Sequence, residues 1–388
     1  MRVLITSPVF PPDLGGPATY VPSISRWLVE RGHEVKVVAF CSDPKPSGYP
    51  FEVVSILPAS IPMRYGRAFF AVWREARSCD VVYVNEHLAL LHVLAARLAG
   101  KPVVIRIMVD GAWEIAHRYG WCGGDDIVKF QGRSYGWKVG LTRRLQRSWW
   151  KAATHIIACS EFLRQILIRT YGVPPGKVEL VHNSYSGPPP DAVRQTPAEA
   201  RSALGLSEDK RYLLTICRLV VWKRVDAIIE SLAKLPADVQ LLVAGDGDML
   251  ESWKELALRL GLADRVHFLG NVPHDRIPLL IRASEVFVLN SEYEGLSHTL
   301  IEVQTLGTPI VASNVCGNPE VVSHGETGFL VDPRQTGELT DALSRLLSDQ
   351  ELRARFRTAG LASSQRFRRD AVFPKVEAAL RRASGTRG

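Results

Sequence analysis

Short apolar runs alternate with longer segments of helical periodicity through most of the chain. The segments between the runs carry apolar residues on one face, as in residues 18–30, 87–98 and 161–171. Continuous apolar strands separated by helices are typical of a parallel sheet that is covered on both faces. In the first half, the runs that predict strands are residues 3–6, 35–40, 53–56, 81–84, 103–107, 155–158 and 178–181.

A proline-rich segment at residues 184–197 interrupts this alternation. It contains four prolines, which continue neither a helix nor a strand ladder, so we predict a linker. The alternation then resumes, with strand-like runs at 212–216, 240–244, 266–269, 286–289 and 309–312 and helical patterns at 225–234, 249–260, 278–283 and 296–306.

Two successive α/β halves in a chain of 388 residues predict two doubly wound, Rossmann-like domains that face a cleft. We predict one domain at residues 1–185 and a second at 198–365. Residues 366–388 are expected to form a C-terminal helix that packs back toward the first domain. Ligands of such sheets bind at the carboxyl ends of the strands, so residues that directly follow strands are the candidates for a site.

The formal net charge of +8 lies entirely in the first half. Residues 1–190 contain 23 Lys and Arg against 14 Asp and Glu, whereas residues 191–388 contain 25 against 26. A one-sided basic surface indicates an anionic partner. The sequence contains no recognised nucleic-acid-binding motif, so we expect no nucleic acid partner.

The most basic segment, residues 129–151, contains seven basic residues and no acidic one. Aromatic side chains are interleaved with them at Tyr135, Trp137, Trp149 and Trp150. Two interpretations fit this composition. The segment lies on an anionic membrane surface, or it forms a helix with a solvated basic face and tryptophans in the core.

The six cysteines show no C-x-x-C spacing and no histidine cluster has zinc-like spacing, which predicts reduced thiols and no metal site. Residues 3–5 are too short an apolar stretch for a secretory leader, and no apolar run reaches 18 residues. We expect a cytoplasmic protein without a membrane span, peripheral on the inner face of the cell membrane if the basic segment binds lipid.

Two glutamates follow the strand at 286–289 at a spacing of eight residues. On a continuous helix, Glu294 and Glu302 would lie about 12 Å apart, too far to act on one bond but suited to two parts of a long ligand. Gly295 allows close backbone approach, and free N–H groups at a helix start favour an anion. In the alternative interpretation, both are ordinary cap-region and surface charges of an amphipathic helix.

Two cations and a glycine follow other strands of the second half. Arg218 and Lys223 come after residues 212–216, where a two-pronged guanidinium and a point charge can neutralise a diphosphate without a metal. The alternative is a solvated basic loop. Gly245 begins a Gly-Asp-Gly turn after residues 240–244, which by itself also fits an ordinary tight turn.

Together these residues resemble the nucleotide-sugar glycosyltransferases of family 4, group 1, whose fold is two facing Rossmann-like domains (the GT-B fold). The sequence E-G-x-S-x-T-L-I-E from Glu294 to Glu302 matches the family's Glu-x7-Glu motif. The strand followed by Arg218 and Lys223 matches the family's phosphate clamp. Further matches are the Gly15-Gly16 pair, Asn183 and residues 307–312, 319–322 and 325–331.

The chain also departs from the family pattern. Cys217 stands where the family commonly has glycine before the clamp arginine, and Lys223 is followed by Arg224 rather than by glycine. Many members carry a histidine after the strand at 103–107, whereas this chain has Asp110 in a D-x-x-W-E pattern. Asp110 either contacts a sugar hydroxyl or caps the following segment.

The resemblance implies transfer of a sugar from a UDP- or GDP-linked donor to an acceptor hydroxyl, with retention of anomeric configuration and no metal or other cofactor. It implies catalytic roles for Arg218, Lys223 and Glu294, to which we add Asp110. The donor-binding residues implied are Gly15, Gly16, Gly245, Tyr293, Gly295, Leu296, Ser297 and Glu302. Polysaccharide, glycolipid or other glycoconjugate synthesis is the expected setting, with a saccharide or lipid-linked saccharide as acceptor. The alternatives are a nucleotide-sugar epimerase or phosphorylase on the same fold, or a catalytically silent nucleotide-sugar-binding partner in a membrane synthesis complex.

Overall fold

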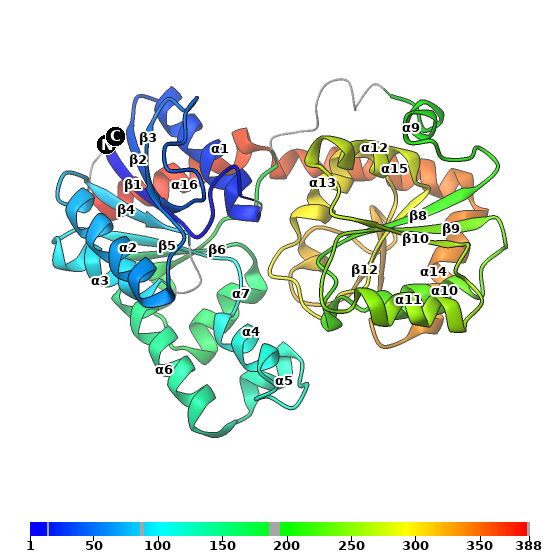
Figure 1. Ribbon diagram of the computed structural model, residues 1–388, viewed down its shortest axis with the longest axis horizontal. Coiled ribbons are helices and arrows are strands. Elements are labelled where there is room, and N and C mark those ends of the chain that lie inside the picture. Colours follow the sequence, from blue (N-terminus) through cyan, green and yellow to red (C-terminus); the bar gives the residue numbers. More distant parts are fainter. Residues whose placement is uncertain (14, 86–88, 186–194, 386–388) are drawn as a thin grey trace. The chain divides into compact units, whose positions relative to one another are not determined.

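The computed structural model describes residues 1–13, 15–85, 89–185 and 195–385. The chain divides into two compact units, residues 1–183 with 369–388 (unit 1) and residues 184–368 (unit 2), each built on one parallel sheet (Figure 1). Most of the predicted linker lies outside the described residues, as does the start of the helix predicted at 87–98.

The sheet of unit 1 has the strand order β3-β2-β1-β4-β5-β6-β7, and every pairing is parallel. All seven strands occur where the apolar runs predict them. Their bounds are β1 Arg2–Ser7, β2 Glu34–Phe40, β3 Glu52–Ile56, β4 Val81–Val84, β5 Val103–Ile107, β6 His155–Ala158 and β7 Val178–Leu180.

Helices cover both faces of this sheet. On one face α1 packs beside α16 over a core of alternating strand residues such as Val3, Ile5 and Tyr83. On the other face α2, α3 and α6 lie in a row, with α3 in contact with both neighbours (Figure 1). The helices are α1 Gly16–Glu30, α2 Ile61–Ala76, α3 Leu90–Leu98, α4 Gly111–Arg118, α5 Ile127–Gly132, α6 Gly136–Ala152, α7 Glu161–Gln165 and α16 Arg369–Ser384.

A buried carboxylate fixes α16 on unit 1. Glu377 contacts Arg31 Nε at 2.8 Å, His33 Nε2 at 2.9 Å and Arg381 Nη2 at 2.8 Å. Burial raises the pKa of Glu377, but the hydrogen bonds from His33, Arg381 and Arg31 outweigh it and hold the pKa at about 2. The C-terminal helix therefore packs on unit 1 through a charge cluster as well as through its apolar face.

The sheet of unit 2 has the order β10-β9-β8-β11-β12-β13 and is also parallel throughout. Its strands are β8 Arg211–Ile216, β9 Val239–Ala244, β10 Val266–Gly270, β11 Val286–Leu289, β12 Ile310–Ser313 and β13 Gly328–Val331. The edge strand β13 was not predicted, because its short run begins at a glycine. A Cβ on Gly328 would lie 2.6 Å from the Ile310 carbonyl oxygen, so this pairing needs a glycine.

The helices of unit 2 pack on both faces of its sheet, so this unit is also doubly wound. Leucine and isoleucine side chains of α10 and α14 fill the core on one face, while α12 packs against α9 and α13. The helices are α9 Pro197–Leu204, α10 Val225–Leu232, α11 Leu250–Arg259, α12 Ile277–Ala283, α13 His298–Leu306, α14 Thr336–Ser348 and α15 Gln350–Ser364.

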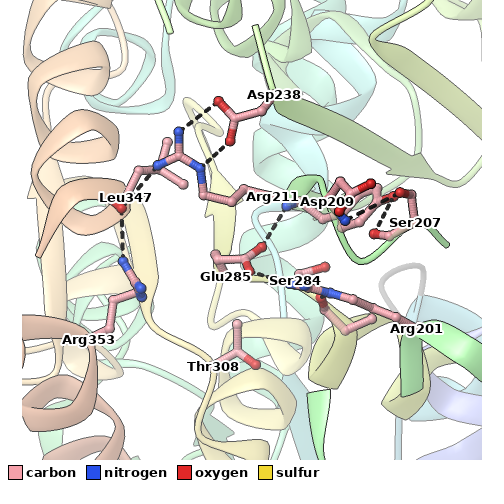
Figure 2. Close-up of polar contacts among 12 residues, drawn as sticks. Arg201, Ser207, Asp209, Arg211, Asp238, Ser284, Glu285, Thr308, Leu347 and Arg353 are labelled. Carbon is pink, nitrogen blue, oxygen red and sulfur yellow. Dashed lines mark hydrogen bonds and ion pairs between the residues drawn. The ribbon is translucent and has the colours of Figure 1, made fainter. Parts of the chain in front are cut away.

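A polar network joins the amino ends of β8, β9 and β11 (Figure 2). The Arg211 guanidinium makes two hydrogen bonds to Asp238, at 2.6 and 2.9 Å, and Glu285 accepts from the Tyr212 amide at 2.6 Å and from Arg201 of α9. These pairs lie at the edge of the sheet opposite to the carboxyl ends, so they hold the unit together without taking part in the site.

Candidate functional site

The strand order of unit 2 reverses at the adjacent strands β8 and β11. From β8 the chain moves to β9 on one side, whereas β11 continues toward β12 on the other. Loops leaving the carboxyl ends of two such strands diverge and leave a crevice, which is where open α/β sheets bind their ligands. The loop after β8 carries Arg218 and Lys223, and the loop after β11 carries Glu294.

The structure brings Lys223 and Glu294 into direct contact. Lys223 Nζ lies 2.5 Å from Glu294 Oε1, and Ser291 Oγ donates to the same oxygen at 2.8 Å. Both charged side chains are largely buried, with 16% and 13% exposed. The two loops are also joined through the backbone, because the Glu292 amide donates to the Trp222 carbonyl at 2.7 Å. A cation and a carboxylate are therefore held together at the switch point of unit 2.

Arg218 differs from the other basic residues of its loop. Its side chain is exposed and, within the described part of the chain, makes no hydrogen bond or ion pair. Arg224 instead binds Asp226 and Glu292. The loop thus offers one uncommitted guanidinium and the Lys223 ammonium at the carboxyl end of β8, which fits the predicted binding of a diphosphate.

Glycines allow four loops to pack in two pairs at this edge. A Cβ on Gly245 would lie 1.9 Å from the Cys217 carbonyl oxygen, and one on Gly317 would lie 2.2 Å from that of Gly295. The Gly317 amide also donates to the Glu294 carbonyl at 3.1 Å. Gly245 is therefore required for backbone packing under the clamp loop, and its predicted contact with the donor stays a prediction.

The segment between Glu294 and Glu302 is only partly helical, in contrast to the predicted helix at 296–306. Ser297 caps α13 by accepting from the Leu300 amide at 3.2 Å, so the helix begins at His298. The side chains of Tyr293 and Leu296 are buried. The predicted contact of these two residues with the donor stays a prediction.

Glu302 is held on α13 by a tyrosine from the start of unit 2. Tyr185 Oη donates to Glu302 Oε1 at 3.1 Å, and the Tyr185 amide in turn donates to the Phe367 carbonyl. Burial raises the pKa of Glu302, an effect that His274 and the Tyr185 hydroxyl oppose. The hydrogen bond from Tyr185 thus fixes one carboxylate oxygen of Glu302, and because the carboxylate is rigid it also sets the direction of the other oxygen.

Asp110 does not fit the catalytic role predicted for it. It is fully buried and caps α4, accepting from the amides of Ala112 and Trp113. Its two oxygens also accept from three side chains, Gln131, Gln146 and Tyr171, at 2.7 to 3.2 Å. Of the two alternatives, the structure shows the cap, because the oxygens are enclosed by protein donors and face no open space.

Gly15 and Gly16 lie in unit 1, between β1 and α1. Gly15 has a positive φ of 157°, and a Cβ there would approach Val9 Cγ1 at 3.1 Å. Gly16 is the first residue of α1 and has open space around its missing side chain. The glycine pair thus lies at the start of α1, in the connection that follows β1, and β1 adjoins β4 at the strand-order switch of unit 1.

The basic segment 129–151 divides into buried and exposed parts. Trp149 and Trp150 are buried in the core, so the core interpretation holds for these two tryptophans. Tyr135 is half-buried and donates to Asp125 at 2.7 Å. Trp137 is exposed. Across the described residues there is no group of three or more His, Cys, Asp or Glu side chains arranged to hold a metal ion. No helix in the described ranges is long and apolar enough to cross a bilayer.

Comparisons with known proteins match both units. Residues 14–185 match the model of glycosyltransferase family 4, and residues 197–362 match that of the glycosyl transferases group 1. The chain belongs to the family 4, group 1 glycosyltransferases. Its fold is the α/β GT-B type, with two Rossmann-like units.

Individual relatives and structures agree with this family. An uncharacterized glycosyltransferase of Methanocaldococcus jannaschii is 25% identical over 365 residues, covering 90% of each chain. The N-acetyl-alpha-D-glucosaminyl L-malate synthase of Bacillus anthracis is 26% identical over 363 residues, covering 88% of this chain and 87% of that protein. The crystal structure of Anabaena HepE in complex with UDP and glucose superposes with a TM-score of 0.77 at 23% identity, covering 98% of this chain and 99% of that one.

Three contributors to the candidate site were not predicted from the sequence. Ser291 donates to Glu294, Gly317 packs against Gly295, and Tyr185 donates to Glu302. Ser291 lies three residues before a motif glutamate, which is a usable signal. Tyr185 is 117 residues from its partner, and no local pattern marks such a contact.

Proposed function

We propose that this glycosyltransferase moves a sugar from a UDP- or GDP-linked donor to an acceptor hydroxyl with retention of anomeric configuration, without a metal. The observation that carries the proposal is the Lys223–Glu294 pair at the switch point of unit 2. A carboxylate for the sugar and a cation for the diphosphate are the two groups that such a donor needs side by side.

The chemistry assigned to these residues is electrostatic. As the bond between the anomeric carbon and the diphosphate oxygen breaks, negative charge grows on the leaving group and positive charge on the sugar ring. Arg218 and Lys223 stabilise the first, and the Glu294 carboxylate, fixed by Ser291, stabilises the second. Because these charges are positioned before the reaction, little reorganisation is needed in the transition state.

We assign the ribose hydroxyls of the donor to Glu302, whose carboxylate Tyr185 orients. The acceptor proton passes to the departing phosphate oxygen as the acceptor oxygen bonds to the anomeric carbon on the face that the diphosphate leaves. This step needs no protein base, which agrees with the enclosure of Asp110.

The proposed setting is glycoconjugate or polysaccharide synthesis in the cytoplasm, at the inner face of the cell membrane. The acceptor class that suits a basic unit 1 is a lipid-linked diphosphate saccharide, because its headgroup is anionic. HepE was crystallised with UDP and glucose, so UDP-glucose is the first donor to test.

A panel of UDP- and GDP-sugars screened by thermal unfolding tests the donor. A bound donor at 100 times its Kd stabilises the protein by about 2.7 kcal/mol, whereas a nucleotide without affinity leaves the midpoint unchanged. The stabilising donor is then incubated without acceptor. Slow release of nucleoside diphosphate supports the transferase. Epimerised free donor indicates the epimerase instead, and stabilisation without any turnover, even with acceptors, indicates the silent binding partner.

A further inference from the structure

The helix α6 has an unusual exposed face for part of a globular unit. Trp137, Leu141 and Leu145 are 74%, 49% and 42% exposed. At 100° per residue they fall within an arc of about 80° on the helix. Val139, Gln146 and Trp150, on the opposite side, are buried in unit 1. The three apolar side chains form a continuous stripe that no described element covers.

Cations border this stripe. Around the helix axis, Arg144 and Lys151 lie within about 40° of the Trp137 edge of the stripe, and Lys138 lies within about 20° of the Leu145 edge. Arg144, Arg147 and Lys151 are exposed and, as far as the described residues extend, form no ion pair. Arg143 is excluded from this set, because it donates to the carbonyls of Phe130 and Arg133 and covers the Phe130 ring.

The same character continues onto the neighbouring helix. α3 lies against α6 (Figure 1). Its side chains Leu94, Arg97 and Leu98 are exposed. The three helices α2, α3 and α6 together carry nine basic residues and one acidic residue. That residue, Glu75, is neutralised by Lys36 at 2.8 Å and by Arg74. The outer surface of these three helices is therefore cationic and partly apolar, and their described residues include no unpaired acidic side chain.

We propose that this surface, termed the α6 face and defined by Trp137, Leu141, Leu145, Arg144 and Lys151, docks onto an anionic lipid bilayer. This proposal rests on the function proposed above, because docking on a bilayer would bring the enzyme to a lipid-linked acceptor. The charges meet anionic headgroups while the tryptophan and the leucines enter the interface between headgroups and acyl chains. An RNA partner would use the cations but leave the leucines exposed to water, so a bilayer accounts for more of the surface.

Co-sedimentation with vesicles tests this proposal on the full-length protein. The wild type is expected to pellet at low salt with vesicles of phosphatidylglycerol and phosphatidylcholine, and to stay in the supernatant with phosphatidylcholine alone. The paired change R144Q/K151Q is expected to weaken partitioning about 30-fold, because each basic residue near an anionic surface contributes about fivefold. The change L141S/L145S is expected to weaken it by roughly tenfold at unchanged charge.

Matched controls come from α11, whose exposed face carries charges of both signs. Leu258 is 69% exposed there, so L258S removes a leucine more accessible than Leu141 or Leu145 from a surface of mixed charge and is expected to leave partitioning unchanged. Trp137 supplies a spectroscopic readout, since brominated lipids should quench part of the wild-type fluorescence and W137F should lose that part.

Several results would overturn the proposal: no pelleting of the wild type, equal loss with L258S, or binding to RNA at salt concentrations that abolish vesicle binding. Thermal stabilisation by the donor, measured without vesicles on the same variants, separates the two proposals. A protein that binds vesicles but no nucleotide sugar refutes only the proposed transferase function. One that binds a donor but no vesicle refutes only the docking face.

Discussion

Replacing Lys223 by methionine tests the assigned chemistry most sharply. The change keeps the length and apolar stem of the side chain but removes the ammonium that lies 2.5 Å from Glu294. A charge 4 Å from a diphosphate at an effective dielectric constant of 20 is worth about 4 kcal/mol. Loss of one preorganised donor to a developing anion commonly costs about 2.7–4 kcal/mol, so we expect a fall in kcat/KM of about 10²–10³-fold.

The same structure predicts how stability changes. In K223M the Glu294 carboxylate, 13% exposed, loses its cation, which we expect to cost about 1–3 kcal/mol of unfolding free energy. In the double variant K223M/E294Q no buried charge is left unpaired, so stability should return toward that of the wild type while activity stays low. Loss of activity therefore separates from loss of fold.

The assay is nucleoside diphosphate release with the stabilising donor, paired with thermal unfolding of each variant. K254M is the matched control, because it removes a lysine that pairs with Glu251 at 2.9 Å on the exposed surface of α11. We expect K254M to behave as wild type in both measurements. Turnover of K223M within about threefold of wild type would refute the assigned role.

Three further predictions concern groups around the site and the fold. D110A should lower the unfolding free energy by about 2–4 kcal/mol, because it removes a helix cap and leaves buried donors unpaired. Donor hydrolysis per folded molecule should persist. A stable but inactive D110A would contradict the capping role. The pKa of Glu377 is held at about 2, below its usual 4.5, so its contribution to the free energy of unfolding is fully present above pH 4.5 and is lost as the pH falls toward 2. In E377Q the unfolding free energy should therefore fall less steeply over this pH range than in the wild type, by at most about 3 kcal/mol. G317A should impair folding or turnover strongly because its Cβ meets the Gly295 carbonyl, whereas G176A, at a glycine with open space and negative φ, should be neutral by circular dichroism and by activity.

The sequence predicted the strands well for a physical reason. Runs such as 81–84 are buried on both faces of a parallel sheet, so they are continuously apolar and differ clearly from the amphipathic helices between them. The strand at 328–331 escaped this pattern, because it is an edge strand whose first residue must be a glycine to fit beside Ile310. The predicted start of the helix at 296 was wrong by two residues, since the Ser297 hydroxyl caps the helix.

The candidate site was predictable in its composition but not in its contacts. The motif residues Arg218, Lys223 and Glu294 follow strands, and strand ends converge at one edge of a sheet. Lys223 and Glu294 are 71 residues apart, however, and only the fold shows that they touch. For Asp110 and the tryptophans at 149 and 150, composition alone left burial undecided, and the structure places all three inside unit 1.

The central claim is transfer with retention at the Lys223–Glu294 site, and early proton NMR of donor turnover tests it most directly. In the absence of acceptor, wild-type protein with the stabilising donor should release nucleoside diphosphate together with free sugar. The first anomer to appear should be that of the donor, before mutarotation, and both signals should disappear in K223M. First appearance of the opposite anomer would contradict retention, and unchanged release by K223M would contradict the assigned site.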